Sequence, residues 1–310
     1  MLDLHQKVNA PLQQIKEYLF EEKGVEVFIK REDLIHPNIS GNKWRKLKYN
    51  LIEAKAKGYT TLLTFGGAYS NHIHALATAG KLLGFKMIGC IRGEEHFPLN
   101  STLLSAQENG MQLHYLSRTE YREKFSKEVI EQLHQKFGDF YLLPEGGTNE
   151  LAVKGCSEII DEINFTPDYL LSAIGTGGTL AGLITGMNHS GQIIGISSLK
   201  GGSFLNNDIT QLLPKRHTNW EVLTDYHFGG YAKTTEELFS FIKKFKQQHH
   251  ILLDPIYTSK MTYAFYQLLK KDTFKRGSKI VLLHTGGLQG WQGMIEQNKV
   301  SKEFIQAFFN

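Results

Sequence analysis

SGNKWRK, residues Ser40–Lys46, is the stretch that decides the fold, because it places one lysine at the start of a predicted amphipathic helix. The segment before it, Val25–Arg31, is rich in β-branched and aromatic residues and predicts a strand. After it, Leu47 and Leu51 recur at helical spacing. A lysine at such a junction can project into a cleft, where burial and nearby cations would lower its pKa and free the amine for Schiff-base chemistry. The alternative for Lys43 is an ordinary surface lysine.

A second motif, GTGGTLAG at Gly175–Gly182, follows the predicted strand Tyr169–Ile174 and opens a helix. Its glycines let the backbone approach an oxyanion closely, and the helix N-terminus offers free N–H groups. Thr176 and Thr179 add hydroxyl donors. The motif lacks the lysine of a nucleoside-triphosphate loop, and its third glycine, Gly178, breaks the dinucleotide spacing. We therefore expect a phosphate or another anion here, the alternative being a simple tight turn.

The loop Gly66–His72 has the same strand–loop–helix form. Its amides and the Ser70 hydroxyl could hold a carboxylate, while the Asn71 amide could bind a phenolic oxygen. An alternative that is compatible with both roles is that Ser70 or Asn71 caps the helix beginning near His72. His72 and His74 are two residues apart on that helix and face different directions, so we predict no metal site.

Two tyrosines and a threonine complete the candidate set. Tyr257 lies just beyond the predicted strand Ile251–Leu253, and Tyr231 follows the pair Gly229-Gly230. Each could reach a ligand, although a tyrosine more often packs with its hydroxyl at the surface. Thr285 ends the last strong strand, where its hydroxyl would point toward a ligand cleft.

Strand-like runs alternate with helical patterns almost to the C-terminus, which favours parallel sheets with crossover helices and an α/β fold. The predicted strands are Val25–Arg31, Thr60–Phe65, Lys86–Ile91, Met111–Leu116, Phe140–Leu143, Tyr169–Ile174, Gln192–Ser197, Ile251–Leu253 and Lys279–His284. The clearest predicted helices between them are Thr119–Lys136, Asn149–Ile163, Thr234–Gln248 and Lys260–Lys271.

The strand pattern also predicts two domains. Residues 46–150 could form a compact open sheet by themselves, whereas residues 1–45 and 151–310 would share a second, larger sheet. Ligands of open α/β sheets bind at the carboxyl ends of the strands, where the glycine-rich turns of this chain fall. We therefore expect the active site in the cleft between the two domains.

Composition excludes several classes of function. With 310 residues, 41% hydrophobic and 21% charged, the chain is an ordinary globular protein of two-lobe size. Its net charge of +4 is small and its basic residues alternate with acidic ones, which argues against a nucleic-acid surface.

The sequence shows no membrane-spanning or secretory segment and no cysteine pattern typical of a metal site. No apolar run approaches the roughly 20 residues that span a bilayer. Residues 1–18 lack the apolar centre of a secretory signal. Cys90 and Cys156 have no metal-type spacing and are expected to be buried, reduced thiols of a cytoplasmic protein, with a redox pair as the alternative.

Taken together, these elements resemble the 1-aminocyclopropane-1-carboxylate deaminase / D-cysteine desulfhydrase family of pyridoxal phosphate enzymes, which have the fold type II, tryptophan synthase β-like architecture. The resemblance implies two open twisted, mostly parallel sheets flanked by helices, with the cofactor bound by the larger domain, and a homodimer. It covers nearly the whole chain and rests on motifs whose order and spacing fit: Lys30–Asp33, Gly41–Lys46, Gly66–Asn71, Gly175–Gly182, Asp254–Tyr257 and His284–Gly287.

The resemblance also implies a role for each candidate residue. Lys43 is expected to hold pyridoxal phosphate through a covalent imine, and Asn71 to bond its 3′ oxygen. The implied catalytic residues are Lys43, Ser70, Tyr231 and Tyr257. The implied cofactor-binding residues are Lys43, Asn71, Gly175, Thr176, Gly177, Gly178, Thr179, Thr258 and Thr285. The implied substrate-binding residues are Ser70, Asn71, His72, Tyr231 and Tyr257.

Two positions separate the activities within the family that the chain resembles. Deaminases carry glutamate after the second tyrosine and leucine before the final Gly-Gly, whereas desulfhydrase-type members carry serine or threonine. This chain has Thr258 and Thr285 there. A glutamate would keep the pyridine nitrogen protonated, as cyclopropane opening requires, whereas neutral hydroxyls suit removal of an α-proton followed by prompt loss of a β-substituent.

The resemblance thus implies a lyase that performs α,β-elimination on a small amino acid, with D-cysteine as the leading substrate. Three alternatives stay open within the cofactor class: the deaminase itself, elimination from a sulfonated, chlorinated or hydroxylated analogue, and a cofactor-binding protein without turnover. From another class, an NAD-dependent oxidoreductase could use the glycine-rich turn at Gly175–Gly182.

Overall fold

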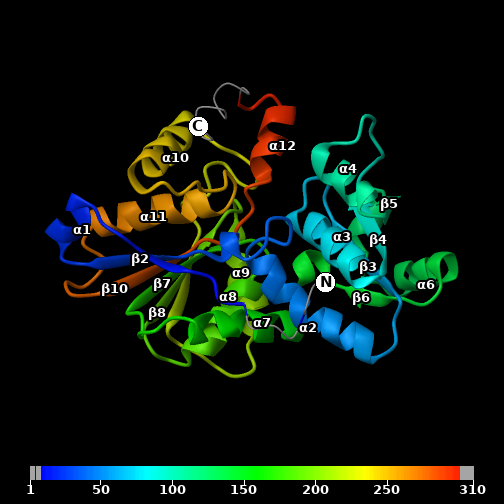
Figure 1. Cartoon of the computed structure of the whole chain (residues 1–310), viewed down its shortest axis with the longest axis horizontal. Coiled ribbons are helices and arrows are strands. Elements are labelled where there is room, and N and C mark those ends of the chain that lie inside the picture. Colours follow the sequence, from blue (N-terminus) through cyan, green and yellow to red (C-terminus); the bar gives the residue numbers. More distant parts are fainter. Residues whose placement is uncertain (1–3, 5–7, 301–310) are drawn as a thin grey trace.

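The computed structural model describes residue 4 and residues 8–300 as two open sheets flanked by helices (Figure 1). The larger sheet has the strand order β1-β2-β10-β7-β8-β9, and the smaller one β5-β4-β3-β6. β1 pairs antiparallel with β2, while the other paired strands in the described part of the chain run parallel. The predicted fold class is confirmed.

The elements follow one another in the alternating order that the sequence predicts. The strands are β1 Leu12–Ile15, β2 Glu26–Lys30, β3 Thr61–Gly66, β4 Lys86–Arg92, β5 Met111–Leu116, β6 Tyr141–Leu143, β7 Tyr169–Ile174, β8 Gln192–Ser197, β9 Trp220–Leu223 and β10 Lys279–Leu283. The α-helices are α1 Tyr18–Lys23, α2 Asn42–Ala56, α3 Asn71–Leu83, α4 Ser101–Glu108, α5 Arg118–Arg122, α6 Lys127–Phe137, α7 Glu150–Asp161, α8 Gly178–Met187, α9 Leu205–Leu212, α10 Glu236–His249, α11 Thr258–Lys270 and α12 Gly290–Glu296. Short 3-10 turns occupy Glu32–Leu34, Glu145–Gly147 and Gly202–Phe204. No helix of these described residues has both the length and the apolarity that crossing a bilayer requires.

One predicted strand is wrong. The segment Ile251–Leu253 is buried but irregular, and β9 occupies the edge of the larger sheet instead. Side chains replace the sheet ladder in satisfying its carbonyls. His284 Nε2 lies 2.8 Å from the carbonyl of Leu252, and Trp291 Nε1 donates to the carbonyl of Leu253 at 3.0 Å.

The helix predicted over Thr119–Lys136 is two helices, α5 and α6. The Ser126 hydroxyl accepts a hydrogen bond from the amide of Val129 at 3.3 Å and so caps the start of α6. Ser117 and Glu120 form a reciprocal capping box at the start of α5. Two N-caps within ten residues therefore interrupt an otherwise amphipathic pattern.

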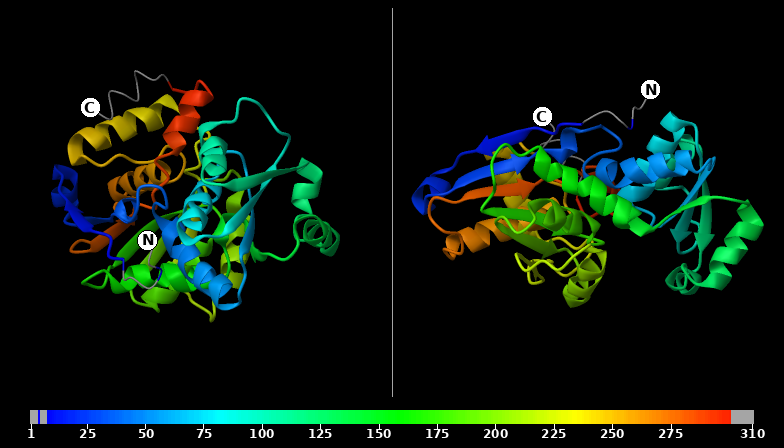
Figure 2. Two further views of the ribbon diagram at one scale, coloured as in Figure 1. Left: turned by 45° about the vertical axis from the view of Figure 1, so that its right-hand side comes forward. Right: turned by 90° about the horizontal axis from the view of Figure 1, so that it is seen from below.

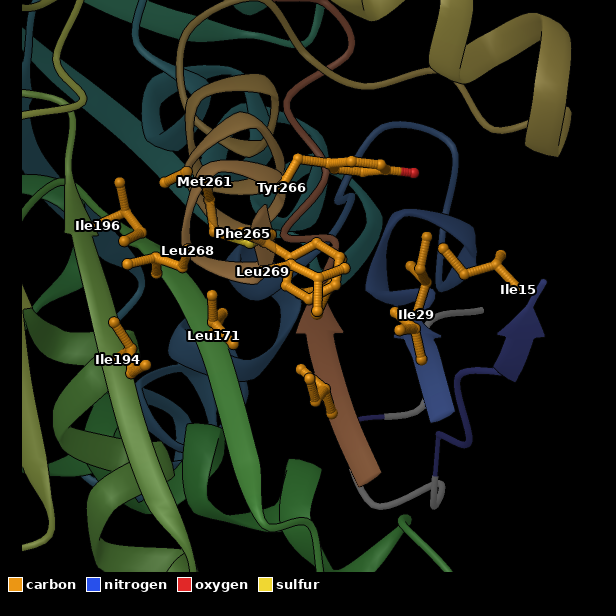
Figure 3. Close-up of a cluster of buried hydrophobic side chains, with 14 of the residues drawn as sticks. Ile15, Ile29, Leu171, Ile194, Ile196, Met261, Phe265, Tyr266, Leu268 and Leu269 are labelled. Atoms are coloured by element: carbon orange, nitrogen blue, oxygen red, sulfur yellow. The ribbon is translucent and has the colours of Figure 1, made fainter. Parts of the chain in front are cut away.

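The core of the larger sheet lies beneath α11. Figure 3 shows Leu171, Ile194 and Ile196, from β7 and β8, facing Phe265 and Leu268 of α11. Each buried side chain of this kind contributes about 1.5–3 kcal/mol to stability relative to its exposed state. This packing fixes the end of α11 that carries Tyr257.

Helices α2 and α7 pack against each other where the two sheets meet, and the sheets lie side by side around them (Figure 2). Gly155 of α7 allows this close approach, because a Cβ there would lie 1.9 Å from the carbonyl oxygen of Arg45. The contact sets the position of α2, whose first turn carries Lys43.

Candidate active site

A cavity of about 1040 Å3 opens beyond the carboxyl ends of β3 and β7, with walls contributed by loops of both sheets. It is lined by most of the predicted site residues: Lys43, Ser70, Asn71, His72, Gly175, Thr176, Gly177, Thr179, Tyr231, Tyr257 and Thr285. Gly178 and Thr258 do not line it. Segments that are far apart in the sequence, such as those of Lys43 and Thr285, thus meet around one ligand-sized space.

Lys43 occupies the second position of α2, and its Nζ donates to Asn42 Oδ1 at 2.8 Å. The other end of that amide, Asn42 Nδ2, donates to Thr179 Oγ1 at 2.8 Å. Burial and the neighbouring cation Lys46 lower the pKa of Lys43 to about 7. A substantial fraction of this side chain is therefore a neutral, nucleophilic amine at neutral pH.

The turn before Lys43 requires a glycine. Gly41 has a φ of +68°, and a Cβ there would lie 1.8 Å from the carbonyl oxygen of Thr285. This contact brings the start of α2 against the segment that follows β10. Because only glycine fits this turn, Gly41 lets the chain place Lys43 in the cavity rather than in solvent.

The glycine-rich turn after β7 is supplemented by Lys46, for which the motifs predicted no role. Lys46 Nζ donates to Thr176 Oγ1 at 3.1 Å, to Thr148 Oγ1 at 2.9 Å and to the Gly146 carbonyl at 3.2 Å. Burial lowers its pKa to about 8. The signal for Lys46 was its spacing, because a residue three positions after Lys43 shares the same helix face.

This corner of the cavity has the donors that a phosphate group needs. The N-terminus of α8 supplies free backbone N–H groups, and Lys46 and the hydroxyl of Thr176 lie beside it. Gly175 leaves no room to spare, since a Cβ there would approach the Tyr257 ring to 3.3 Å. A phosphorylated aldehyde would therefore find an anion cradle and a reactive amine in the same cavity.

Ser70 caps α3, as the alternative interpretation of that loop predicted. Its Oγ accepts hydrogen bonds from the amides of His72 and Ile73 at 3.2 and 3.3 Å. The hydroxyl proton remains available, so capping and ligand binding are compatible. Asn71 lies near the far wall, where its Nδ2 is 3.0 Å from the position of a Cβ on Gly287.

His72 is buried and neutral. Burial, followed by the charges of Lys43 and Lys46, lowers its pKa to about 3. Thr64 Oγ1 donates to the Leu143 carbonyl at 2.9 Å, so it accepts from His72 Nε2, which lies 2.9 Å away. Nδ1 is then the unprotonated nitrogen, and it has no hydrogen-bond partner among the described residues.

Tyr231 and Tyr257 meet edge to face, with ring centroids 6.0 Å apart. Burial raises the pKa of each hydroxyl, and for Tyr257 the adjacent Tyr231 raises it further. Both are therefore protonated hydrogen-bond donors at neutral pH rather than bases.

The two threonines that separate the family activities differ in their surroundings. Thr285 lines the cavity. Thr258 is fully buried, and its hydroxyl donates to Asp254 Oδ2 at 2.5 Å while accepting from the Asp254 amide at 2.9 Å. Its side chain is thus engaged with Asp254, in the turn that precedes α11.

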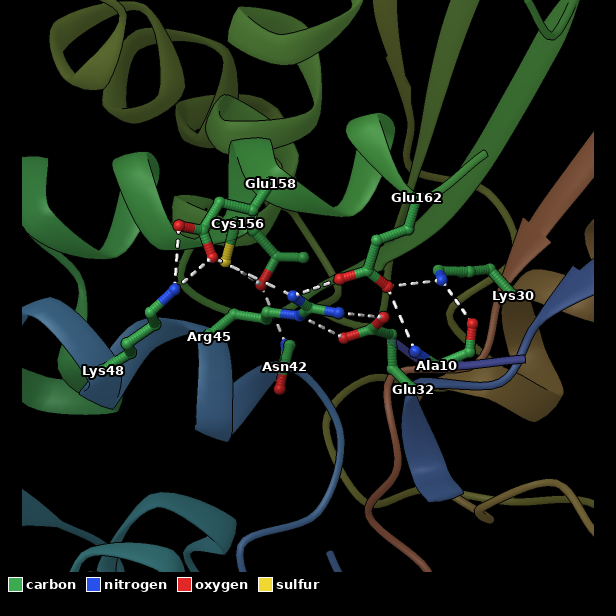
Figure 4. A network of polar contacts seen from close by, with 10 residues as sticks. Ala10, Lys30, Glu32, Asn42, Arg45, Lys48, Cys156, Glu158 and Glu162 are labelled. Atoms are coloured by element: carbon green, nitrogen blue, oxygen red, sulfur yellow. Dashed lines mark hydrogen bonds and ion pairs between the residues drawn. The ribbon is translucent and has the colours of Figure 1, made fainter. Parts of the chain in front are cut away.

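A buried ionic network positions α2 from behind the cavity (Figure 4). Arg45 donates to both carboxylate oxygens of Glu32, at 2.8 and 3.0 Å, and pairs with Glu162 Oε1 at 2.7 Å. Lys30 Nζ pairs with Glu162 Oε2 at 2.6 Å and donates to the Ala10 carbonyl. The network joins β2, α2 and the end of α7, so it restrains the helix that carries Lys43.

The described residues contain neither a cluster of metal ligands nor a disulfide bond. No group of three or more histidine, cysteine, aspartate or glutamate side chains there could hold a metal ion. Cys90 and Cys156 are buried and form no disulfide.

Comparison with known proteins gives the family. The family model for "Pyridoxal-phosphate dependent enzyme" matches residues 6–286. The bifunctional D-cysteine desulfhydrase/1-aminocyclopropane-1-carboxylate deaminase of Arabidopsis thaliana is 31% identical over 301 residues, covering 88% of this chain and 75% of that protein. The D-cysteine desulfhydrase of Klebsiella pneumoniae is 27% identical over 301 residues, covering 87% and 89%.

A solved structure described as an ACC deaminase homologue superposes with a TM-score of 0.81 at 30% identity, covering 99% of this chain and 95% of that one. These matches remove the NAD-dependent oxidoreductase from the alternatives. With an amine, a phosphate cradle and an aromatic wall in one cavity, the chain belongs to the pyridoxal-phosphate dependent enzymes and is a lyase of the 1-aminocyclopropane-1-carboxylate deaminase / D-cysteine desulfhydrase type.

Proposed function

We propose that this enzyme eliminates the β-substituent of a small amino acid, and that D-cysteine is its substrate, giving pyruvate, ammonia and hydrogen sulfide. The observation that carries the proposal is the Lys43 amine, whose pKa is lowered to about 7 in the cavity that also holds the phosphate cradle. The D-cysteine desulfhydrase names of two relatives support the choice of substrate.

The cofactor would lie across the cavity from one sheet to the other. Lys43 would hold it covalently, while Lys46, Thr176 and the N-terminus of α8 would hold its phosphate. Asn71 would bond the 3′ oxygen, and Thr285 would face the pyridine nitrogen. When bound, pyridoxal phosphate withdraws electrons from the α-carbon of the amino acid.

The chain's own residues would bind the substrate and move its protons. The Ser70 hydroxyl and the amides that follow it would hold the carboxylate. The freed Lys43 amine would take the α-proton, a step suited to a base whose pKa lies near the working pH. Tyr257, a protonated donor beside Tyr231, would give a proton or a hydrogen bond to the departing thiolate.

The nearest alternative is 1-aminocyclopropane-1-carboxylate deamination. Thr285 at the cavity wall counts against it, because a neutral hydroxyl does not keep a pyridine nitrogen protonated. The buried Asp254 cannot substitute for the missing glutamate, since its carboxylate accepts from the amides of Ile256, Tyr257 and Thr258.

Product analysis tests the proposal. Purified enzyme supplied with pyridoxal phosphate should release sulfide and pyruvate from D-cysteine, with no 2-oxobutyrate from the cyclopropane amino acid. The matched control is Lys43→Ala, which should be inactive. Turnover of the cyclopropane substrate but not of D-cysteine would contradict the choice of reaction.

Two further expectations accompany the proposal. The cleft would lie between residues 46–150 and a larger unit made of residues 1–45 and 151–310, the outermost of which lie beyond the described part of the chain. We also propose a cytoplasmic homodimer, for which light scattering of the purified protein would give twice the mass of 35.2 kDa.

A further inference from the structure

The active-site cavity contains a buried hydrogen-bond acceptor that the proposed mechanism does not use, Nδ1 of His72. This side chain lines the cavity from the second position of α3 and is 1% exposed. Its tautomer is fixed from the opposite edge of the ring, because Thr64 Oγ1 donates to the Leu143 carbonyl and so accepts from Nε2–H. Nδ1 keeps a free lone pair and has no partner among the described residues.

The neighbouring turn leaves this edge of the ring uncovered. Gly147 has a φ of +66°, and a Cβ there would lie 3.0 Å from His72 Cε1 and 3.3 Å from Nδ1. The left-handed backbone and the short distances both exclude a larger residue at this position. A buried polar atom without a partner is destabilising, so its presence in the wall of an active site indicates a partner that arrives with the reaction.

Two cations act on His72, and only one of them has N–H groups to spare. The charges of Lys43 and Lys46 both lower the pKa of the imidazole. Lys46 Nζ already donates to the Gly146 carbonyl and to two threonine hydroxyls, which uses all three N–H groups of an ammonium. Lys43 Nζ makes one hydrogen bond within the described residues, to Asn42 Oδ1. Lys43 is therefore the donor that Nδ1 can receive.

We propose that His72 is a positioning residue for the elimination, and that its Nδ1 accepts a hydrogen bond from the Lys43 amine once the substrate has displaced that amine from the cofactor. The inference rests on the proposed function and adds a residue to it. In the proton transfer, the bond from the α-carbon to hydrogen breaks, an N–H bond forms on Lys43 Nζ, and the electron pair stays with the α-carbon. A lone pair at a fixed position would orient the amine for this step and bind the ammonium that it forms.

The surroundings of His72 protect the acceptor from titration. Burial and the two lysine charges lower the pKa of His72 to about 3, whereas the pKa of Lys43 is about 7. Nδ1 therefore stays unprotonated throughout the pH range in which Lys43 exchanges its proton. A histidine protonated on both nitrogens would instead repel the lysine.

Exchange of the α-proton tests the proposal with a substrate that has no leaving group. Alanine has no β-substituent to lose, so NMR in D2O measures how fast the holoenzyme replaces its α-proton, for each enantiomer. At saturating alanine, His72→Leu should slow the exchange at least about tenfold, as loss of a hydrogen bond to a charged group implies. His72→Asn, whose side-chain oxygen can replace Nδ1 as acceptor, should retain most of the rate.

His74→Leu is the matched control. His74 lies on the same helix but not on the cavity wall, so its loss should change the exchange rate less than about twofold, the scatter expected of a substitution that removes no hydrogen bond to the site.

Nitrogen NMR of the imidazole gives a second readout that does not depend on activity. In the unmodified enzyme, with and without pyridoxal phosphate, the shifts should show Nε2 protonated and Nδ1 unprotonated from about pH 5.5 to about 9.5, roughly the range in which a buried amine titrates. Because it uses the unmodified enzyme, this measurement stands even where a variant fails to fold. Thr64→Val removes the acceptor of Nε2–H, so Nδ1 should become partly protonated and alanine exchange should slow.

The outcomes separate this inference from the proposed function. Exchange at the unmodified rate in His72→Leu, or a proton on Nδ1 in the unmodified enzyme, would overturn the role of His72. A loss confined to the Kd of alanine would overturn it too, because His72 would then bind the substrate rather than position Lys43. Exchange of alanine without turnover of D-cysteine would instead refute the proposed substrate and leave the role of His72 intact.

Discussion

At the scale of single residues, the site depends on two lysines that share one helix face and have different partners. Lys43 is held by a side-chain amide, and Lys46 by two hydroxyls and a carbonyl. Lys46 is buried and Lys43 is half-buried. The positive charge of Lys46 contributes to the lowered pKa of Lys43. The two lysines therefore differ in charge and role. Lys43 supplies a reactive neutral amine, whereas Lys46 stays a cation that can hold an anion.

The pH dependence of cofactor attachment tests this division. Because the pKa of Lys43 is about 7, the rate at which the apoenzyme takes up pyridoxal phosphate should rise as pH increases through 7 and then level off. An unperturbed lysine would keep gaining reactivity to about pH 10.4. The measurement is the rate at which violet absorbance appears after apoenzyme and pyridoxal phosphate are mixed. It is repeated at pH values from about 5.5 to about 9.5, roughly the range in which a buried amine titrates.

The control for that experiment is Lys46→Gln. Removing the neighbouring positive charge should move the midpoint of the rate profile of Lys43 to higher pH, while burial, the larger cause, keeps it below that of a free lysine. A midpoint near that of a free lysine in the unmodified enzyme would show that Lys43 is not held in the cavity as described.

At the scale of helices and strands, α2 is positioned by its buried ions. Arg45→Met would leave the carboxylates of Glu32 and Glu162 without their shared partner. Breaking a buried pair of this kind costs about 3–5 kcal/mol of unfolding free energy. Urea unfolding should therefore show a large loss for this variant, accompanied by weaker attachment of the cofactor at Lys43.

Lys48→Met, one turn further along α2, is the matched control. Its ion pair with Glu158 at 2.8 Å is partly exposed, so its loss should cost no more than about 1 kcal/mol. Similar losses for the two variants would mean that the Arg45 network contributes no more than a surface pair.

A second buried lysine positions the loop that carries Tyr231. Lys260, in the first turn of α11, donates to the carbonyls of His227 and Gly230 at 2.9 and 2.8 Å. Lys260→Met should leave those carbonyls unpaired, at a cost of about 1–3 kcal/mol, and release Tyr231 from its contact with Tyr257. We expect kcat/KM to fall while cofactor attachment is retained, with the exposed Lys270→Met as control. Unchanged kinetics would show that the loop needs no such restraint.

How much of these elements the sequence predicts depends on whether the cause is local. The strands Tyr169–Ile174 and Gln192–Ser197 are continuous apolar runs bounded by turns, and their predicted bounds match the structure. The segment Ile251–Leu253 has the same apolar character, but distant side chains bond its carbonyls. Periodicity cannot register a partner contributed by His284, so this segment is indistinguishable from a strand in the sequence alone.

In the candidate site, too, features with a local cause are predictable from the sequence and features with a non-local cause are not. Motifs brought most of the predicted residues to one cavity, because turns after parallel strands meet at one edge of a sheet. The role of Lys46 depends on contacts between segments about 100 residues apart in the sequence, which spacing alone does not show. The resemblance implies a cofactor contact for Thr258, whereas its hydroxyl bonds Asp254 in the turn before α11, a contact that the sequence pattern does not show.

At the scale of the whole molecule, the cavity joins the two sheets, since its lining residues come from loops of both. A ligand held by Asn71 on one side and by the α8 turn on the other would tie the sheets together. Binding to the native state alone adds about 2.7 kcal/mol when the ligand is at a hundred times its Kd. The cofactor should therefore stabilise the fold as well as supply chemistry.

Removing pyridoxal phosphate should accordingly lower Tm by about 5 °C, the order expected when a few kcal/mol of binding energy is lost from a chain of this size. Differential scanning calorimetry of holoenzyme, apoenzyme and reconstituted enzyme measures the change, and reconstitution should restore it. In Lys43→Ala the cofactor is held by non-covalent contacts only, so its addition should restore less of the loss. Equal Tm values for apoenzyme and holoenzyme would mean that the ligand does not bridge the two sheets, and the placement of the cofactor between Asn71 and the α8 turn would then be wrong.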